Sequence, residues 1–205
     1  IKKSYNMKIN LSEKYQIDIY KNIPYDKEIT IKEIKYNVEI SRKSFEKTSE
    51  KTPGIQADIL IQTKNFTYLK NTIFEKFCET YGYNIDTPYH LKYWTYISDN
   101  KNIYSGYHIH TNNDEIYLQN TYTWVFYIQM PKNLKNDDGK IFFRTEDEVE
   151  HKILPEEGDL IFFPTDLPHR PEINLDAETE RIVLAGNLCI LDINKEYKKK
   201  IKTFI

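Results

Sequence analysis

The second half of this sequence is a series of short extended segments with no helical pattern between them. Each segment is rich in aromatic and β-branched residues, which favour strands. Turn-forming clusters such as Asn136-Asp137-Asp138-Gly139 separate the segments. A chain of this kind buries its apolar faces as an antiparallel sandwich or barrel. We therefore predict a mainly β fold with strands at 91–98, 122–130, 140–144, 159–164 and 181–191.

The first part of the chain also contains extended segments. Residues 17–20, 29–31 and 34–38 carry alternating apolar side chains, which predicts half-buried strands. Residues 44–53 are polar and charged, and Thr52-Pro53-Gly54 is a turn signal. We expect a surface loop there.

One helix is predicted between these two groups of strands. Residues 66–81 repeat apolar side chains at helical spacing, and Gly82 supplies a stop signal. We expect this helix to pack against the outside of a sheet. A length of 205 residues is enough for one domain, so we expect a single domain over 1–205, with its core at about 88–192 and an N-terminal flank at 1–87.

Composition narrows the class of protein. The net charge of −2 argues against a general nucleic-acid binder. The two cysteines, Cys78 and Cys189, lie in apolar patterns, so we expect buried thiols and no disulfide framework. No apolar run reaches the roughly 20 residues that a membrane span needs, and no secretory pattern opens the chain. The sequence begins at Ile1, and Met7 is a possible natural start.

Three of the five histidines stand in suggestive positions. His108 and His110 are two residues apart, so in a strand both imidazoles would point to one side and could bind a late first-row metal. His169 follows an apolar strand, and Pro168 stiffens the backbone just before it. A chance pair on a surface strand and an ordinary loop histidine are the alternatives.

Arg181 opens an apolar strand twelve positions after His169. Val183, Ala185 and Asn187 would share its face and leave room for a ligand. An arginine that points into a barrel needs an anionic partner, such as a dicarboxylate bound by the guanidinium fork. The alternative is a surface arginine paired with Glu178 or Glu180.

Three stretches resemble the 2-oxoglutarate- and Fe(II)-dependent oxygenases, especially a group of bacterial and phage members. They are 106–110 after a strand with Trp94, 123–131, and the run from Gly158-Asp159-Leu160 through Pro168-His169 to Glu180-Arg181-Ile182. The resemblance covers roughly residues 90–190. It implies a double-stranded β-helix, also called a jelly roll or cupin-like barrel.

The resemblance also implies roles for single residues. His108 and His169 would hold Fe(II), and Arg181 would hold the far carboxylate of 2-oxoglutarate. This sequence departs from the family's His-x-Asp/Glu motif, because His110 stands in the carboxylate position. Either His110 is itself the third ligand, which we favour, or Asp114 or Glu115 swings in from the following loop.

Further residues could complete such a site. Tyr127 and Asn187 are candidates for contact with the cosubstrate. The aromatic residues Trp94, Tyr96 and Trp124 would line the pocket or belong to the core.

The expected activity is hydroxylation of a small-molecule or amino-acid-type substrate, with 111–121 and 165–176 as candidate specificity loops. We expect no membrane partner and no nucleic acid, and a cytoplasmic location, in the host if the chain is phage-encoded. A cupin-like metalloenzyme without 2-oxoglutarate and a non-catalytic β-sandwich are the rivals.

Overall fold

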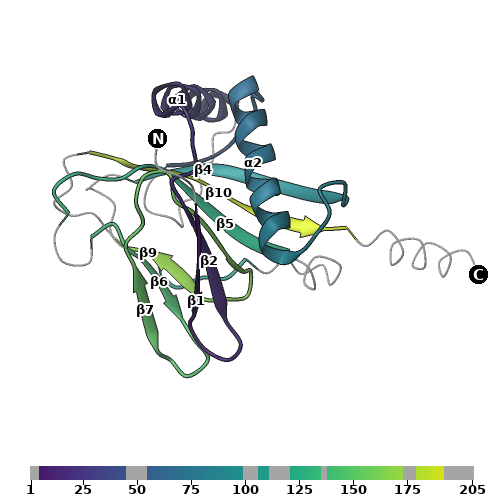
Figure 1. Ribbon diagram of the computed structural model, residues 1–205. Helices are drawn as coiled ribbons and strands as arrows, with labels where there is room; N and C mark the ends of the chain where they lie inside the picture. The colour runs from purple at the N-terminus through teal and green to yellow at the C-terminus, as the bar shows by residue number, and fades with distance from the viewer. Residues whose placement is uncertain are drawn as a thin grey trace, which may run out of the picture.

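In the residues that it describes, the computed structural model has two helices on one side of a large sheet and a small sheet on the other (Figure 1). The structure describes residues 5–44, 55–98, 106–110, 121–134, 138–172 and 179–191. Within these residues the predicted mainly β architecture, with helices packed outside, is confirmed.

The large sheet, called the major sheet, is antiparallel and has the strand order β1-β2-β8-β5-β10-β4-β3. Its strands are β1 Tyr5–Asn10, β2 Gln16–Lys21, β3 Ile55–Asp58, β4 Tyr89–Ser98, β5 Thr121–Gln129, β8 Leu160–Pro164 and β10 Arg181–Ile190. The predicted strand at 17–20 and the strands predicted in the second half of the chain are confirmed, with small shifts at their ends.

The small sheet, called the minor sheet, has the order β7-β6-β9. Its strands are β6 Ile141–Arg144, β7 Glu150–Ile153 and β9 His169–Pro171. An isolated bridge between His108 and His169 adds the segment 106–110 beside β9. Strand β9 therefore begins with His169, and the bridge places His108 next to it.

Alternate side chains of the major sheet form two separate cores, as a period of two requires. One core lies under the helices and the other faces the minor sheet. Strand β5 shows the division: Trp124, Phe126 and Ile128 belong to the first core, whereas Val125 and Tyr127 belong to the second. The face toward the minor sheet is the one that carries the site described below.

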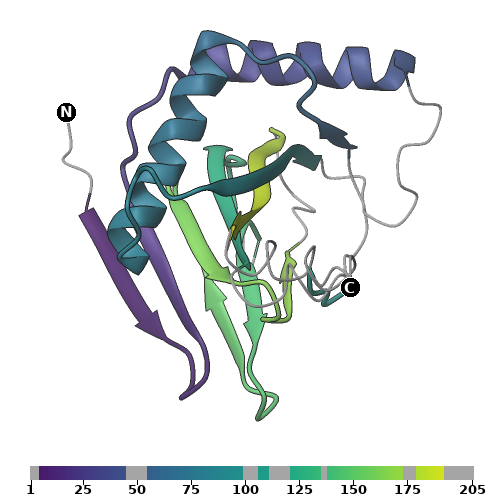
Figure 2. The same cartoon turned by 90° about the vertical axis from the view of Figure 1, so that its right-hand side faces the viewer.

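Helix α2, Lys64–Tyr81, confirms the predicted helix. The Thr63 side chain accepts a hydrogen bond from the backbone N–H of Phe66 and so caps its start. Gly82 ends it in the left-handed region, at φ 75°. The helix lies over the outer face of the major sheet and crosses α1 (Figure 2).

The predicted strands at 29–31 and 34–38 are wrong, because both lie inside helix α1, Lys27–Ser44. The Asp26 carboxylate accepts a hydrogen bond from the backbone N–H of Ile29 and so caps the first turn. From there the buried side chains recur at helical intervals: Thr30, Ile34, Asn37 and Val38. The apolar residues of this segment alone alternate as in a strand. The helical pattern becomes visible only when the buried polar residues Thr30 and Asn37 are included.

Of the predicted loop at 44–53, Ser44 ends α1 and the rest lies outside the described residues. Cys78 and Cys189 are buried free thiols, as predicted. None of the helices in the described ranges combines the length and the apolar character that crossing a bilayer requires.

Candidate metal centre

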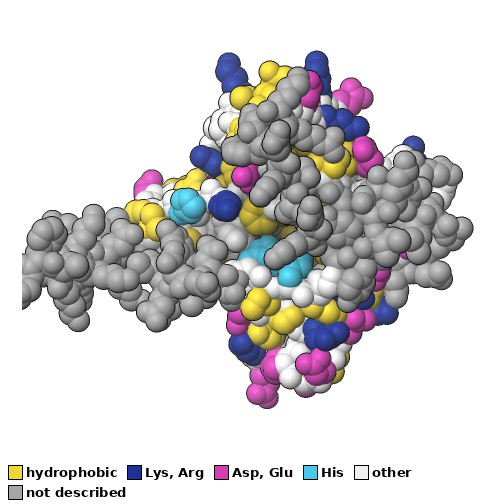
Figure 3. Space-filling model, turned by 180° about the vertical axis from the view of Figure 1, so that it is seen from behind, with side chains coloured by type: hydrophobic (Ala, Val, Ile, Leu, Met, Phe, Trp, Pro, Cys, Tyr) yellow, Lys and Arg dark blue, Asp and Glu magenta, His cyan; other side chains and the backbone are white. Residues whose placement is uncertain are grey.

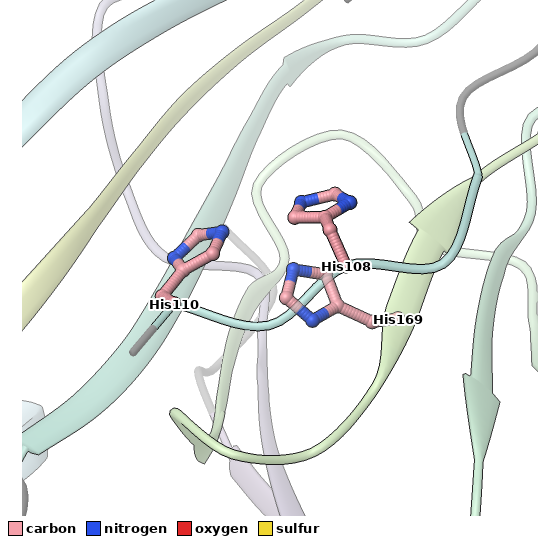
Figure 4. Close-up of side chains that lie close together, drawn as sticks. All are labelled: His108, His110 and His169. Atoms are coloured by element: carbon pink, nitrogen blue, oxygen red, sulfur yellow. The ribbon is translucent and has the colours of Figure 1, made fainter. Parts of the chain in front are cut away.

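Three histidines meet where the segment 106–110 runs beside β9 (Figure 4). The backbones of His108 and His169 exchange two hydrogen bonds, of 3.0 and 3.1 Å. The backbone N–H of His110 donates to the carbonyl oxygen of Thr165 at 3.0 Å. These bonds fix two segments that are far apart in the sequence, so the imidazoles are brought together by backbone pairing.

The three rings face one another at short range. The His108 and His169 ring centroids are 4.4 Å apart, and those of His110 and His169 are 4.9 Å apart. One ligand nitrogen from each ring can be chosen so that all three lie within 4.8 Å of one another. Nitrogens bound at about 2.0–2.1 Å around one metal would lie roughly 3 Å apart. Small ring rotations would therefore close the set on an ion.

In each of these three imidazoles, the Nδ1 atom already has an oxygen partner. His108 Nδ1 lies 3.3 Å from the Gly106 carbonyl oxygen, and His169 Nδ1 lies 2.9 Å from that of Leu167. His110 Nδ1 lies 2.9 Å from Asn187 Oδ1. Because these oxygens accept, each Nδ1 carries the proton and each Nε2 keeps a free lone pair. Because all three rings share this tautomer, the Nε2 atom of each one can bind a metal.

Desolvation favours the uncharged form of all three imidazoles, from exposed His108 and half-buried His110 to buried His169. Desolvation lowers the pKa of His108, lowers the pKa of His110 to about 4, and lowers the pKa of His169 well below its ordinary value. The neighbouring imidazoles act in the same direction on His110 and His169. At neutral pH the site therefore presents neutral ligands to a cation.

The histidines stand in the wall of a cavity of about 440 Å³. Figure 3 shows imidazole side chains in a hollow on this face, with basic and acidic side chains at its edge. The cavity is also lined by residues from the inner face of the major sheet: Gln56, Asp58, Lys92, Trp94, Tyr96, Val125, Tyr127, Arg181, Val183, Ala185 and Asn187. Its size suits a small molecule.

Arg181 lies in the same cavity and is 3% exposed. Its guanidinium makes one hydrogen bond to a described residue, from Nη1 to the Glu172 carbonyl oxygen at 3.1 Å. Ser98, directly opposite Arg181 on β4, has a buried hydroxyl without a hydrogen-bond partner among the described residues. Unused donors beside a buried charge make this end of the cavity suitable for an anion.

The structure tests the alternative environment of Arg181, but it does not describe the acidic residues that were alternatives for the third metal ligand. Arg181 is buried, so the surface-arginine alternative is wrong, and the Glu180 carboxylate lies 3.0 Å from Lys35 Nζ. Glu178 lies outside the described residues, as do Asp114 and Glu115.

The aromatic candidates divide between the two faces. Trp94, Tyr96 and Tyr127 line the cavity, whereas Trp124 is buried in the core under the helices. Val183, Ala185 and Asn187 share the cavity with Arg181, as strand alternation predicts. Asn187 contacts His110, a role that its sequence position did not indicate.

Sequence reasoning missed the residues that β3 brings to the cavity, Gln56 and Asp58, and their neighbour Lys92. Nothing in the local pattern shows that 55–58 pairs with β4. Thr123 was missed too. Its hydroxyl lies 3.2 Å from Asn187 Oδ1 and supports the amide that contacts His110.

Solved structures share this fold at low sequence identity. A Pseudomonas putida prolyl-4-hydroxylase superposes with a TM-score of 0.56 and 16% identity, over 85% of this chain and 92% of that chain. A Trichoplax adhaerens prolyl hydroxylase, in complex with a hypoxia inducible factor peptide fragment, gives 0.58 and 15%, over 87% and 84%. An oxidoreductase of the 2OG-Fe(II) oxygenase family from Burkholderia pseudomallei gives 0.50 and 13%, over 69% and 70%.

These likenesses confirm the predicted double-stranded β-helix. No protein-family model and no curated protein sequence matches the chain.

Proposed function

We propose that this chain is an Fe(II)- and 2-oxoglutarate-dependent oxygenase that hydroxylates a C–H bond of its substrate. The observation that carries the proposal is a shared cavity: three imidazoles converge in its wall, and the buried guanidinium of Arg181 lines it too. The solved structures with this fold include prolyl hydroxylases and a 2OG-Fe(II) oxygenase family protein, which supports the same reaction here.

His108, His110 and His169 are the proposed metal ligands. His110 is preferred to Asp114 or Glu115 because its imidazole already faces the other two. Imidazole nitrogens suit Fe(II), and three ligands leave positions for other molecules. Three neutral ligands leave the full double positive charge of the ion in place, which favours a dianionic cosubstrate such as 2-oxoglutarate.

Arg181 is the proposed anchor of the far carboxylate of 2-oxoglutarate. A guanidinium binds a carboxylate through two parallel hydrogen bonds, and Arg181 has the free donors for both. The Ser98 hydroxyl lies beside it. Tyr127 lines the same part of the cavity, and its hydroxyl has no hydrogen-bond partner among the described residues, so it can donate to the same carboxylate. We assign Asn187 to positioning His110.

Bound Fe(II) and 2-oxoglutarate would supply the oxidising chemistry, in which O₂ and 2-oxoglutarate yield succinate, CO₂ and one oxygen atom inserted into the C–H bond. The chain itself holds and orients the reactants. The small apolar side chains of Val125, Val183 and Ala185 line the cavity between Arg181 and the histidines and leave space there for the reactants.

A metalloenzyme that uses no 2-oxoglutarate, as among the cupins, is the second candidate. The observation that favours it is the third imidazole in place of a carboxylate. This candidate gives the buried Arg181 no task, so the arginine separates the two.

The test measures thermal unfolding with Mn(II) as a redox-inert substitute, then with Mn(II) and 2-oxoglutarate together. A ligand that binds only the folded chain stabilises it by about 2.7 kcal/mol at one hundred times its dissociation constant. We expect both additions to raise the melting temperature. With Fe(II) and O₂ we expect succinate to form from 2-oxoglutarate.

Arg181→Lys keeps the positive charge and removes the fork, so it should retain the Mn(II) shift and lose most of the 2-oxoglutarate shift. Arg144→Lys, outside the cavity, is the matched control and should behave as the wild type. A Mn(II) shift without a 2-oxoglutarate shift in the wild type would favour the second candidate. Absence of metal binding would indicate a non-catalytic β-sandwich.

A further inference from the structure

The cavity has a second polar end, formed by β3 and β4. Asp58 from β3 and Lys92 from β4 line it, with Trp94 between them and His110. Arg181 lies at the other end, because it pairs with Ser98. Lys92 precedes Ser98 by six positions on one strand, a distance of about 20 Å. The end at Asp58 and Lys92 is therefore separate from the end proposed for 2-oxoglutarate.

The two charges at this end are unused. Asp58 and Lys92 have exposed side chains of opposite sign. Within the described ranges, neither side chain makes a hydrogen bond or an ion pair. Each is therefore available to a ligand that enters the cavity.

The spacing of the two charges suits one small molecule. Asp58 is directly opposite Trp94, and Lys92 is two residues from Trp94 on the same face. Side chains in this diagonal relation have their Cβ atoms about 7–8 Å apart. An ammonium and a carboxylate carried on one carbon atom fit between the ends of such side chains.

Both charges also lie close to the proposed metal ligands. Lys92 is directly opposite Asn187, whose amide oxygen contacts His110. The Trp94 ring centroid is 5.6 Å from that of His110. Each charged side chain is therefore separated from His110 by a single intervening side chain.

We propose that this end of the cavity binds a free α-amino acid. Asp58 holds its ammonium, Lys92 holds its carboxylate, and its side chain passes Trp94 toward the three histidines. The inference rests on the proposed function for the reaction that follows, and the binding itself needs no turnover. A residue inside a peptide lacks both charges, so this end selects against peptides.

The experiment is a binding titration of free α-amino acids, each with its N-acetyl and its carboxamide derivative. It is carried out by calorimetry on the metal-free protein and on protein loaded with Mn(II) and 2-oxoglutarate. We expect at least one free amino acid to bind. Each derivative should bind about tenfold or more weakly, since each loses one charge-assisted hydrogen bond.

Two variants assign the contacts. Asp58→Asn should abolish the preference over the N-acetyl derivative, and Lys92→Met should abolish the preference over the carboxamide. Both positions are exposed, so the fold should be retained. Asp86→Asn and Lys64→Met, exposed and outside the cavity, are the matched controls and should leave both preferences intact.

The outcomes separate this inference from the proposed function. Protein that binds Mn(II) and 2-oxoglutarate but no free amino acid overturns the inference alone. Equal or tighter binding of the derivatives also overturns it and points to a peptide. Amino-acid binding that depends on Asp58 and Lys92, without metal binding, supports this site and overturns the oxygenase.

Discussion

Asn187 does not belong to the proposed metal ligands, and it acts on the metal site by positioning His110. Its Oδ1 lies 2.9 Å from His110 Nδ1 and 3.2 Å from the Thr123 hydroxyl. We predict that Asn187→Ala weakens metal binding about 10- to 100-fold, the usual effect of losing such a partner. Asn187→Asp should keep or improve the affinity, because a carboxylate accepts more strongly from Nδ1–H. Competition with a chelator measures both.

The urea midpoint of each variant is the control, since a general loss of structure would lower it. Thr123→Val should give a smaller effect of the same kind, because it removes only the support of the amide. Wild-type affinity in Asn187→Ala would contradict the positioning role and leave the His110 tautomer to be set by other contacts.

At the scale of the element, strand β10 carries both faces of the structure. Arg181, Val183 and Asn187 line the cavity, whereas Leu184 and Leu188 pack under the helices. This division is readable from the sequence, because alternation needs only neighbouring residues. Helix α1 was misread for the converse reason: its buried face includes Thr30 and Asn37, polar residues that only tertiary contacts identify as internal.

Gly186 on β10 is required by close packing in the core under the helices. A Cβ atom there would collide with the Lys92 carbonyl oxygen and would lie 2.8 Å from both Trp124 Cζ2 and Tyr93 Cβ. We predict that Gly186→Ala lowers the free energy of unfolding by about 3 kcal/mol, the upper range for overpacking. Urea unfolding measures the change.

In a double-mutant cycle, Gly186→Ala should cost less in a Trp124→Leu background than in the wild type, because one of the colliding groups is gone and the backbone contact remains. Ala185→Gly, the reverse exchange on the opposite face, controls for the change in backbone freedom. An unchanged midpoint in Gly186→Ala would show that the strands separate easily at this position.

At the scale of the whole molecule, the sequence predicts individual helices and strands better than it predicts which strands pair with one another. The resemblance placed His108, His110, His169 and Arg181 in one site, and the structure brings them to one cavity. The charged end at Asp58 was out of reach, because β3 pairs with β4 across more than thirty intervening residues. Long-range pairing of a four-residue strand leaves no local signal.

The proposed metal would join the two sheets, since His169 belongs to β9 and His110 contacts Asn187 on β10. We predict that Mn(II) slows amide hydrogen exchange in both strands together, about 100-fold at one hundred times its dissociation constant, for amides that exchange when the sheets part. His169→Gln should lose most of the effect in both sheets, because His169 is the one proposed ligand that lies in a strand of the minor sheet. Protection confined to residues 106–110 would mean that the ion binds one segment and leaves the two sheets free to move apart.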